Sequence, residues 1–214
     1  MPTQISFIRH GHVDNPQNII YGRLPGFSLS DTGRLQAQRA AEALRDVPLA
    51  ALFTSPRERA VQTAQILLAA RPNLTPQIND LIDEIHIYLE GHPAAAGAAL
   101  NWDMYTGMPT GYEQPEDIAA RAERFITEMR RDYAGQHVAA VSHGDVLAFV
   151  LLRVLGEPQR PNLKHTLARF GVTDDYPAPG SIVTLTYHTA APDEIPELHY
   201  LRPYGDELLL PSLS

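Results

Sequence analysis

Apolar residues recur along the chain in two patterns, short runs typical of buried strands and longer stretches with helical spacing. The strands that we expect span residues 5–8, 51–54, 76–79, 137–141, 181–187 and 198–201. The expected helices span residues 30–44, 55–70, 114–133 and 146–155. Because strands alternate with helices almost throughout, the pattern predicts an α/β fold, a three-layer α/β/α sandwich with a largely parallel central sheet.

Two helix starts carry clear local signals. Ser30 precedes a stretch with helical spacing and is the expected N-cap of its helix. Ser55-Pro56-Arg57-Glu58 combines an N-cap serine, a proline at the first helical position and a glutamate at the third. Arg59 would then lie in the first turn of the second helix.

Residues 85–113 differ from the rest, with an alanine-rich stretch, several glycines and no clear period. We expect an irregular insertion there that contributes to a substrate pocket. No internal repeat, low-complexity tract or linker interrupts the chain. Its 214 residues are therefore expected to form a single domain spanning 1–214.

Composition and charge exclude several classes of protein. The formal net charge of -8 disfavours binding to nucleic acid or to anionic membranes, since both require a basic surface. No apolar run is long enough to cross a bilayer. The chain has no cysteine, which excludes thiolate nucleophiles and cysteine-ligated zinc. The first four residues lack a secretory pattern, so a cytoplasmic location is the default expectation, and the oligomeric state, a homodimer included, is left open.

Candidate chemistry gathers where strands end. Arg9-His10-Gly11 follows the first expected strand, and Ser142-His143-Gly144 follows the strand at 137–141. In open parallel sheets ligands bind beyond the carboxyl ends of the strands, where the Arg59 helix also begins. Two guanidiniums, two imidazoles and the helix start at Gly144 would together suit a phosphoryl group.

Four motifs occur in the order typical of one family. They are Arg9-His10-Gly11, the run from Leu29-Ser30 through Gly33 to Gln36-Ala37, the run from Ser55-Pro56 through Arg59-Ala60 to Thr63-Ala64, and Ser142-His143-Gly144. Together they resemble the histidine phosphatase, or phosphoglycerate mutase-like, superfamily. The resemblance implies a phosphoglycerate mutase-like fold and covers most of the chain.

The resemblance also implies a mechanism. His10 would attack phosphorus, while Arg9, Arg59, His143 and Gly144 would hold the phosphoryl oxygens. Water would then hydrolyse the phosphohistidine. The substrate would be a small phosphorylated metabolite, and neither a metal nor a cofactor would be needed. An imidazole is largely neutral and nucleophilic near neutral pH, which fits this role.

The family also uses a carboxylic acid that protonates the departing oxygen. Glu84 is the best match by resemblance, although the segment lacks the family's middle glycine and tryptophan and is one residue shorter. Asp83 therefore stays an alternative. Protonation near neutral pH requires a raised pKa, which the sequence does not reveal.

Several residues near these motifs are candidates for contacting substrate. His12 stands where the family often has an acidic residue, and Asp145 stands where it often has a small one. Asn15 and Arg23 lie in a glycine-rich loop over the expected pocket and are further candidate contacts, although turn formation explains them equally well. Trp102, with the neighbouring Met104 and Tyr105, would either wall the leaving-group pocket or form a small hydrophobic cluster.

Three alternatives compete with a phosphatase. His10-x-His12-x-Asp14 resembles a metallo-hydrolase motif, but that hypothesis assigns no role to Arg9 or Arg59. A phosphoglycerate mutase would use the same nucleophile, although Pro16 stands where its motif normally has asparagine. A non-catalytic phospho-ligand binding protein would keep the pocket and lose turnover.

Overall fold

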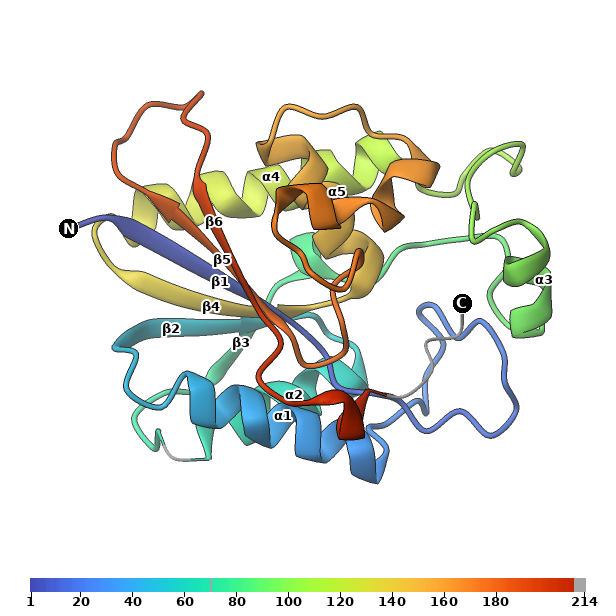
Figure 1. Ribbon diagram of the computed structural model, residues 1–214, viewed down its shortest axis with the longest axis horizontal. Coiled ribbons are helices and arrows are strands. Elements are labelled where there is room, and N and C mark those ends of the chain that lie inside the picture. Colours follow the sequence, from blue (N-terminus) through green and yellow to red (C-terminus); the bar gives the residue numbers. More distant parts are fainter. Residues whose placement is uncertain (70, 210–214) are drawn as a thin grey trace.

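The computed structural model describes residues 1–69 and 71–209, and a six-stranded sheet crosses its centre (Figure 1). The strands are β1 (Thr3–Arg9), β2 (Leu49–Thr54), β3 (Pro76–Ile78), β4 (His137–Ser142), β5 (Ile182–Tyr187) and β6 (Glu197–Leu201). They lie in the order β3-β2-β4-β1-β5-β6. The first four run parallel, whereas β5 and β6 are antiparallel to their neighbours.

Helices cover both faces of the sheet (Figure 1). The helices α1 (Asp31–Ala43) and α2 (Glu58–Leu68) lie on one face, and α4 (Pro115–Asp132) and α5 (Gly144–Val154) lie on the other. The predicted three-layer sandwich with a largely parallel sheet is confirmed. The described residues also include short 3-10 helices: η1 (Asp80–Ile82), η2 (Pro161–His165), η3 (Leu167–Phe170) and η4 (Asp206–Leu208).

Each face of the sheet has its own hydrophobic core. Phe7 and Phe53 project toward α4, where both rings meet Phe125 edge to face. On the opposite face, Leu52 packs with Ala60 and Ala64 of α2. Successive strand residues alternate between the faces, so a strand covered on both sides is apolar at nearly every position.

The two predicted helix starts have different outcomes. Ser30 is the N-cap of α1, and its hydroxyl accepts a hydrogen bond from the Gly33 amide at 3.0 Å. The prediction for Ser55 is wrong, because α2 begins at Glu58 with Arg57 as N-cap. The Ser55 hydroxyl is instead buried between two ionisable side chains of the candidate site. The predicted end of this helix at residue 70 lies outside the described residues.

The loop after β1 packs directly against the first turn of α1. A Cβ atom on Gly11 would lie 2.2 Å from the Gly33 carbonyl oxygen, and one on Gly33 would lie 2.0 Å from the His12 carbonyl oxygen. Both distances are far below van der Waals contact. The Gln36 side chain also accepts a hydrogen bond from the His12 amide at 2.8 Å. These contacts fix the backbone that carries His10.

The segment between η1 and α4 contains one short helix, α3 (Ala94–Ala99), and otherwise turns. A cavity beside the sheet is lined in part by Ile85, Ile87, Trp102 and Met104 from this segment. Across residues 1–69 and 71–209, no helix combines the length and the apolar character that crossing a bilayer requires.

Candidate active site

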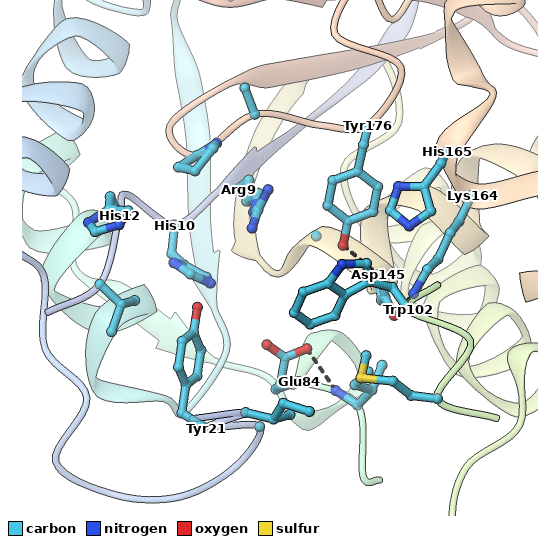
Figure 2. Close-up of a pocket in the computed structure, with 18 of the residues that line it drawn as sticks. Arg9, His10, His12, Tyr21, Glu84, Trp102, Asp145, Lys164, His165 and Tyr176 are labelled. Atoms are coloured by element: carbon cyan, nitrogen blue, oxygen red, sulfur yellow. Dashed lines mark hydrogen bonds and ion pairs between the residues drawn. The ribbon is translucent and has the colours of Figure 1, made fainter. Parts of the chain in front are cut away.

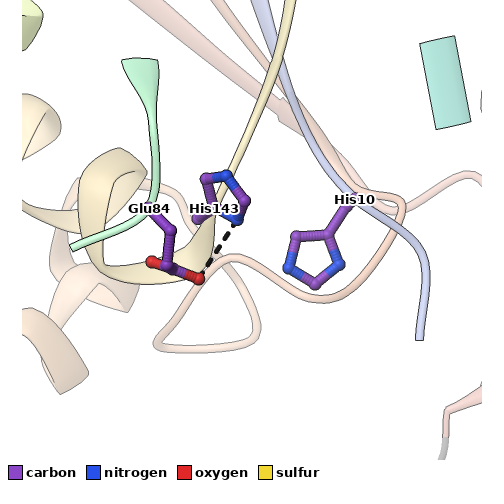
Figure 3. Close-up of side chains that lie close together, drawn as sticks. All are labelled: His10, Glu84 and His143. Carbon is purple, nitrogen blue, oxygen red and sulfur yellow. Dashed lines mark ion pairs between the residues drawn. The ribbon is translucent and has the colours of Figure 1, made fainter. Parts of the chain in front are cut away.

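Three ionisable side chains meet beyond the carboxyl ends of β1 and β4 (Figure 3). His10, Glu84 and His143 each place a nitrogen or carboxylate oxygen within 4.8 Å of the others. The two imidazole rings are 5.1 Å apart, edge to face. Parallel pairing of β1 with β4 aligns Arg9 with Ser142, which brings the residues after both strands to one place.

The hydrogen bonds of His10 define its tautomer. Its Nδ1 lies 2.7 Å from the Gly11 carbonyl oxygen, which can only accept, so Nδ1 carries the proton. The Nε2 lone pair is therefore available, and it accepts a hydrogen bond from Arg59 Nε at 3.2 Å. Burial, reinforced by the positive charge of Arg59, lowers the pKa of His10 well below its ordinary value. A neutral imidazole thus presents Nε2 to the cavity.

Arg59 is almost fully buried at the start of α2 and connects the other site residues. Its Nη2 donates to Glu84 Oε2 at 2.9 Å and to the Gly22 carbonyl at 2.8 Å. The guanidinium also lies over the Tyr21 ring, 4.7 Å from its centroid. These contacts fix the guanidinium beside the Nε2 atom of His10.

Arg9 retains an unsatisfied donor. Its Nη1 donates to the Pro177 carbonyl at 2.7 Å, and the guanidinium carbon lies 5.2 Å from the centroid of the Tyr176 ring. Its Nε is buried and has no hydrogen-bond partner among the described residues. A buried charged donor without an acceptor is costly, so this position favours an anion.

Both ring nitrogens of His143 have partners in the site. The Ser55 hydroxyl donates to Asp83 at 2.9 Å, so it accepts from His143 Nε2 at 2.7 Å. The remaining nitrogen, Nδ1, lies 3.1 Å from Glu84 Oε2 and 3.4 Å from Arg59 Nη2, which also donates to Glu84. Burial lowers the pKa of His143. Ser55 therefore orients the imidazole, and Asp83 orients Ser55.

The structure separates the two candidate acids. Asp83 accepts hydrogen bonds from Arg57 Nε at 2.8 Å and from Arg57 Nη2 at 2.9 Å, which anchors its carboxylate away from the cavity. Glu84 lines the cavity instead. Burial raises the pKa of Glu84, but the charge and hydrogen bond of His143, together with the charge of Arg59, outweigh it and hold this pKa well below the ordinary value. A bound dianion would push the same pKa upward.

The other predicted contacts lie in different places. His12, Asn15, Gly144 and Asp145 all line the cavity. His12 is hydrogen-bonded to the Ser30 hydroxyl through Nδ1 at 2.9 Å. The side-chain amide of Asn15 donates to the Ile19 carbonyl at 2.9 Å and accepts from the Ile19 N–H at 3.2 Å. These three side chains and Gly144 stay candidate contacts.

Arg23 is not brought into the cavity. Its Nη2 donates to Glu113 at 2.9 Å and its Nε donates to the Glu84 carbonyl at 2.7 Å. Two acceptors from the segment after η1 therefore hold its guanidinium, and the contact with substrate expected of Arg23 stays a prediction. The acceptors lie far from Arg23 in sequence, and no local pattern indicates them.

The cluster of His10, Glu84 and His143 has the residue types and spacing of a metal site. Arg59, however, already donates to His10 and to Glu84, so a cation there would meet a guanidinium at close range. His12 and Asp14 of the metallo-hydrolase motif lie outside the cluster. The donor set favours an anion, and a metal-free reaction stays a prediction.

Sequence analysis missed the roles of Ser55, Lys164 and Tyr176. Lys164 is the chain's only lysine, which is a weak signal in itself, and it is buried beside the cavity. Tyr176 stacks on Arg9 and packs against Gly144, where a Cβ atom would lie 2.3 Å from its hydroxyl oxygen. Both residues follow α5 in segments without motifs.

Comparison with known proteins agrees with this geometry. A family model described as histidine phosphatase superfamily, branch 1, matches residues 5–180, and the chain belongs to this superfamily. It is 38% identical over 149 residues to an uncharacterised protein of Mycobacterium tuberculosis, covering 66% of this chain and 73% of that one. It is 29% identical over 160 residues to the adenosylcobalamin/alpha-ribazole phosphatase of Salmonella typhi, covering 71% and 79%.

A solved structure extends the similarity to nearly the whole chain. The mycobacterial glucosyl-3-phosphoglycerate phosphatase superposes with a TM-score of 0.73 at 26% identity, covering 94% of this chain and 97% of its own. The named relatives are phosphatases with different substrates. The similarity thus supports phosphate hydrolysis as the reaction, but it does not indicate which leaving group is released.

Proposed function

We propose that this protein is a phosphatase that hydrolyses a small phosphate monoester through a phosphohistidine on His10. The observation that carries the proposal is the His10 tautomer, which leaves Nε2 unprotonated in a residue that lines the same cavity as Arg9, whose Nε has no hydrogen-bond partner among the described residues. Phosphatases among the relatives support the same reaction. The substrate would be a metabolite in the cytoplasm, and the reaction would need neither a metal nor a cofactor.

In the first step His10 Nε2 attacks phosphorus in line with the ester oxygen. The Nε2–P bond forms as the P–O bond breaks, and the carboxyl proton that Glu84 carries beside the bound dianion passes to the departing oxygen. Arg9, Arg59 and the Gly144 amide at the start of α5 stabilise the charge on the equatorial oxygens. Arg59 Nε transfers its hydrogen bond from Nε2 to the phosphoryl group as the attack begins.

In the second step a water molecule attacks the phosphohistidine. Glu84, now ionised, accepts a proton from the water as the new P–O bond forms and the P–Nε2 bond breaks. Inorganic phosphate leaves and His10 regains its neutral form. The same carboxyl group thus serves as acid and then as base.

Labelling tests the intermediate. After incubation with a ³²P-labelled phosphate monoester and rapid quenching, we expect an acid-labile, base-stable label on the protein and release of inorganic phosphate. His10→Ala should abolish the label and lower kcat/KM by about 1,000-fold or more. Transfer to a second hydroxyl without phosphate release would instead indicate a mutase.

His188→Ala provides the matched control. His188 is exposed and follows β5, whose last residue pairs with Thr3 at the opposite end of β1 from His10. This variant should keep both label and activity. Full activity in the His10 variant would overturn the nucleophile assignment.

A further inference from the structure

The cavity extends well past the phosphoryl site. Its volume is about 830 Å³, and one part of it, which we call the leaving-group subsite, is bordered by Trp102, Asp145, Lys164, His165 and Tyr176 (Figure 2). This subsite lies beyond Arg9 and Glu84 as seen from His10. A leaving group attached to the phosphoryl group would occupy it.

The charges in the leaving-group subsite are internally paired. Lys164 Nζ lies 2.8 Å from Asp145 Oδ2, and both side chains are almost completely buried, at 2% and 6% exposure. Asp145 also accepts hydrogen bonds from Tyr176, at 2.6 Å, and from Tyr105. Burial, with the nearby Asp145 charge, raises the pKa of both tyrosines well above their ordinary values, so both hydroxyls stay neutral donors.

Among the five residues that border the subsite, Lys164 alone is a cation, and it is paired with Asp145, whereas Arg9 lies on the side of His10 and is assigned to the phosphoryl group. Burial, with the charge of Lys164, lowers the pKa of His165, which is therefore neutral near neutral pH. Asp174 and Asp175 also line the cavity, and Asp174 is paired with Arg202 at 3.2 Å. A carboxylate on a leaving group in the subsite would meet the Asp145 carboxylate and a lysine already paired with it.

Trp102 brings a neutral, unpartnered donor to the border of the subsite. The indole Nε1 of Trp102 is buried and has no acceptor among the described residues. Trp102 and its neighbour Asn101 both have positive φ, 58° and 50°, a costly conformation for residues other than glycine. Strain of this kind is retained where the surroundings enforce it, as in a binding site. The indole thus combines an apolar face with a donor that suits a hydroxyl oxygen.

We propose that the leaving group is an uncharged, hydroxyl-bearing molecule such as a polyol or a sugar, and that Asp145 sets this preference by neutralising Lys164. The proposal rests on the phosphatase function proposed above. Asp145 would exclude carboxylate-bearing esters because its own charge cancels the cation that would otherwise attract them.

A matched pair of substrates tests the preference. Sorbitol 6-phosphate and 6-phosphogluconate differ only in the group at the far end, a hydroxymethyl group in the first and a carboxylate in the second. We expect kcat/KM for the sorbitol ester to be about tenfold higher or more, because like charges close together in a binding site are costly. Equal rates, or faster hydrolysis of the gluconate ester, would overturn the proposal.

Phenyl phosphate separates this test from that of the proposed function. It carries no carboxylate, so its hydrolysis reports the reaction independently of the preference. Loss of phosphate release from all three esters would overturn the phosphatase assignment. Release from phenyl phosphate with no preference between the other two would overturn only the inference drawn from the subsite.

Two variants locate the preference. Asp145→Asn leaves Lys164 uncompensated, and the ratio of the two kcat/KM values should shift about tenfold toward the gluconate ester. The ratio cancels any loss common to both substrates. In Asp145→Asn/Lys164→Met both charges are absent, and the ratio should return toward the native preference. An unchanged ratio in the single variant, measured on folded protein, would contradict the role of Asp145.

Discussion

The cavity has two halves, the phosphoryl site around His10 and the leaving-group subsite, and they differ in how many of their charged groups are paired within the protein. Around His10, two guanidiniums converge, and one of them keeps a buried donor without an acceptor. In the leaving-group subsite, the one lysine and its aspartate are paired and surrounded by tyrosine hydroxyls. The first half is electrostatically incomplete without a ligand, whereas the second is complete.

This difference indicates what each half contributes. An incomplete half attracts its ligand by charge and stabilises charge that develops during the reaction. The leaving-group subsite, whose charges are already paired, has no free charge for a ligand. It therefore selects by shape and by neutral hydrogen bonds, and it excludes ions. Substitutions in the first half should therefore reduce catalysis, whereas substitutions in the second should alter stability and selectivity.

The largest effect after removal of the nucleophile should come from Glu84→Gln. Its amide cannot donate a proton to the departing oxygen, so hydrolysis of an alkyl ester such as sorbitol 6-phosphate should slow by about 100-fold or more. Phenyl phosphate should lose much less, since phenolate needs less protonation. Steady-state kcat for the two substrates measures the contrast.

Asp83→Asn serves as the comparison for that experiment. Asp83 is anchored by Arg57 and lies outside the cavity lining, so its variant should slow both esters to a similar extent. If the Asp83 variant showed the leaving-group dependence and the Glu84 variant did not, the assignment of the acid would be reversed.

A smaller effect, on stability, should follow Lys164→Met. This change leaves the buried Asp145 carboxylate without its cation, which should lower the free energy of unfolding by about 3 kcal/mol. Adding Asp145→Asn should recover most of the loss, because no buried charge then remains unpaired. Urea denaturation of both variants completes the cycle. If Lys164→Met were as stable as the native protein, Lys164 and Asp145 would not form the buried ion pair that their distance indicates.

The smallest predicted effect concerns the titration of His10. A lowered pKa means that the folded protein keeps His10 neutral at pH values where an unfolded histidine takes up a proton, below about 6.5. The contribution of His10 to stability is therefore present above this value and is lost as the pH falls toward the folded pKa. Imidazole ¹⁵N spectra, assigned with His10→Ala, should show a midpoint below 6.5, and a midpoint at or above it would contradict the burial argument.

The sequence predicted the sandwich because its determinants are local. Apolar runs at β1 and β4 and the helical spacing in α2 and α4 report burial directly. Parallel strands also carry their following residues to one edge, so His10 and His143 could be placed together before any coordinates were known.

Other parts of the site depend on contacts between distant segments. Ser55 has the residue type and position of an N-cap, yet its hydroxyl serves His143 and Asp83 through tertiary contacts. Arg23 has the position of a substrate contact, but Glu113 holds it from another segment. The partners of Lys164 likewise come from separate elements. None of these pairings leaves a periodic or spacing signal in the sequence.

The contact between Gly11 and Gly33 has a consequence for how this protein can change over evolutionary time. Neither residue has a functional group, yet a Cβ atom on Gly11 would collide with the backbone of Gly33, and one on Gly33 would collide with the backbone of His12. A side chain at either position would have to push the loop after β1 away from the first turn of α1, and a change of a neighbouring side chain does not relieve a clash with backbone atoms. The positions least tolerant of mutation therefore include two that do no chemistry, and drift in substrate preference is easier at the far side of the cavity than at the loop behind the nucleophile.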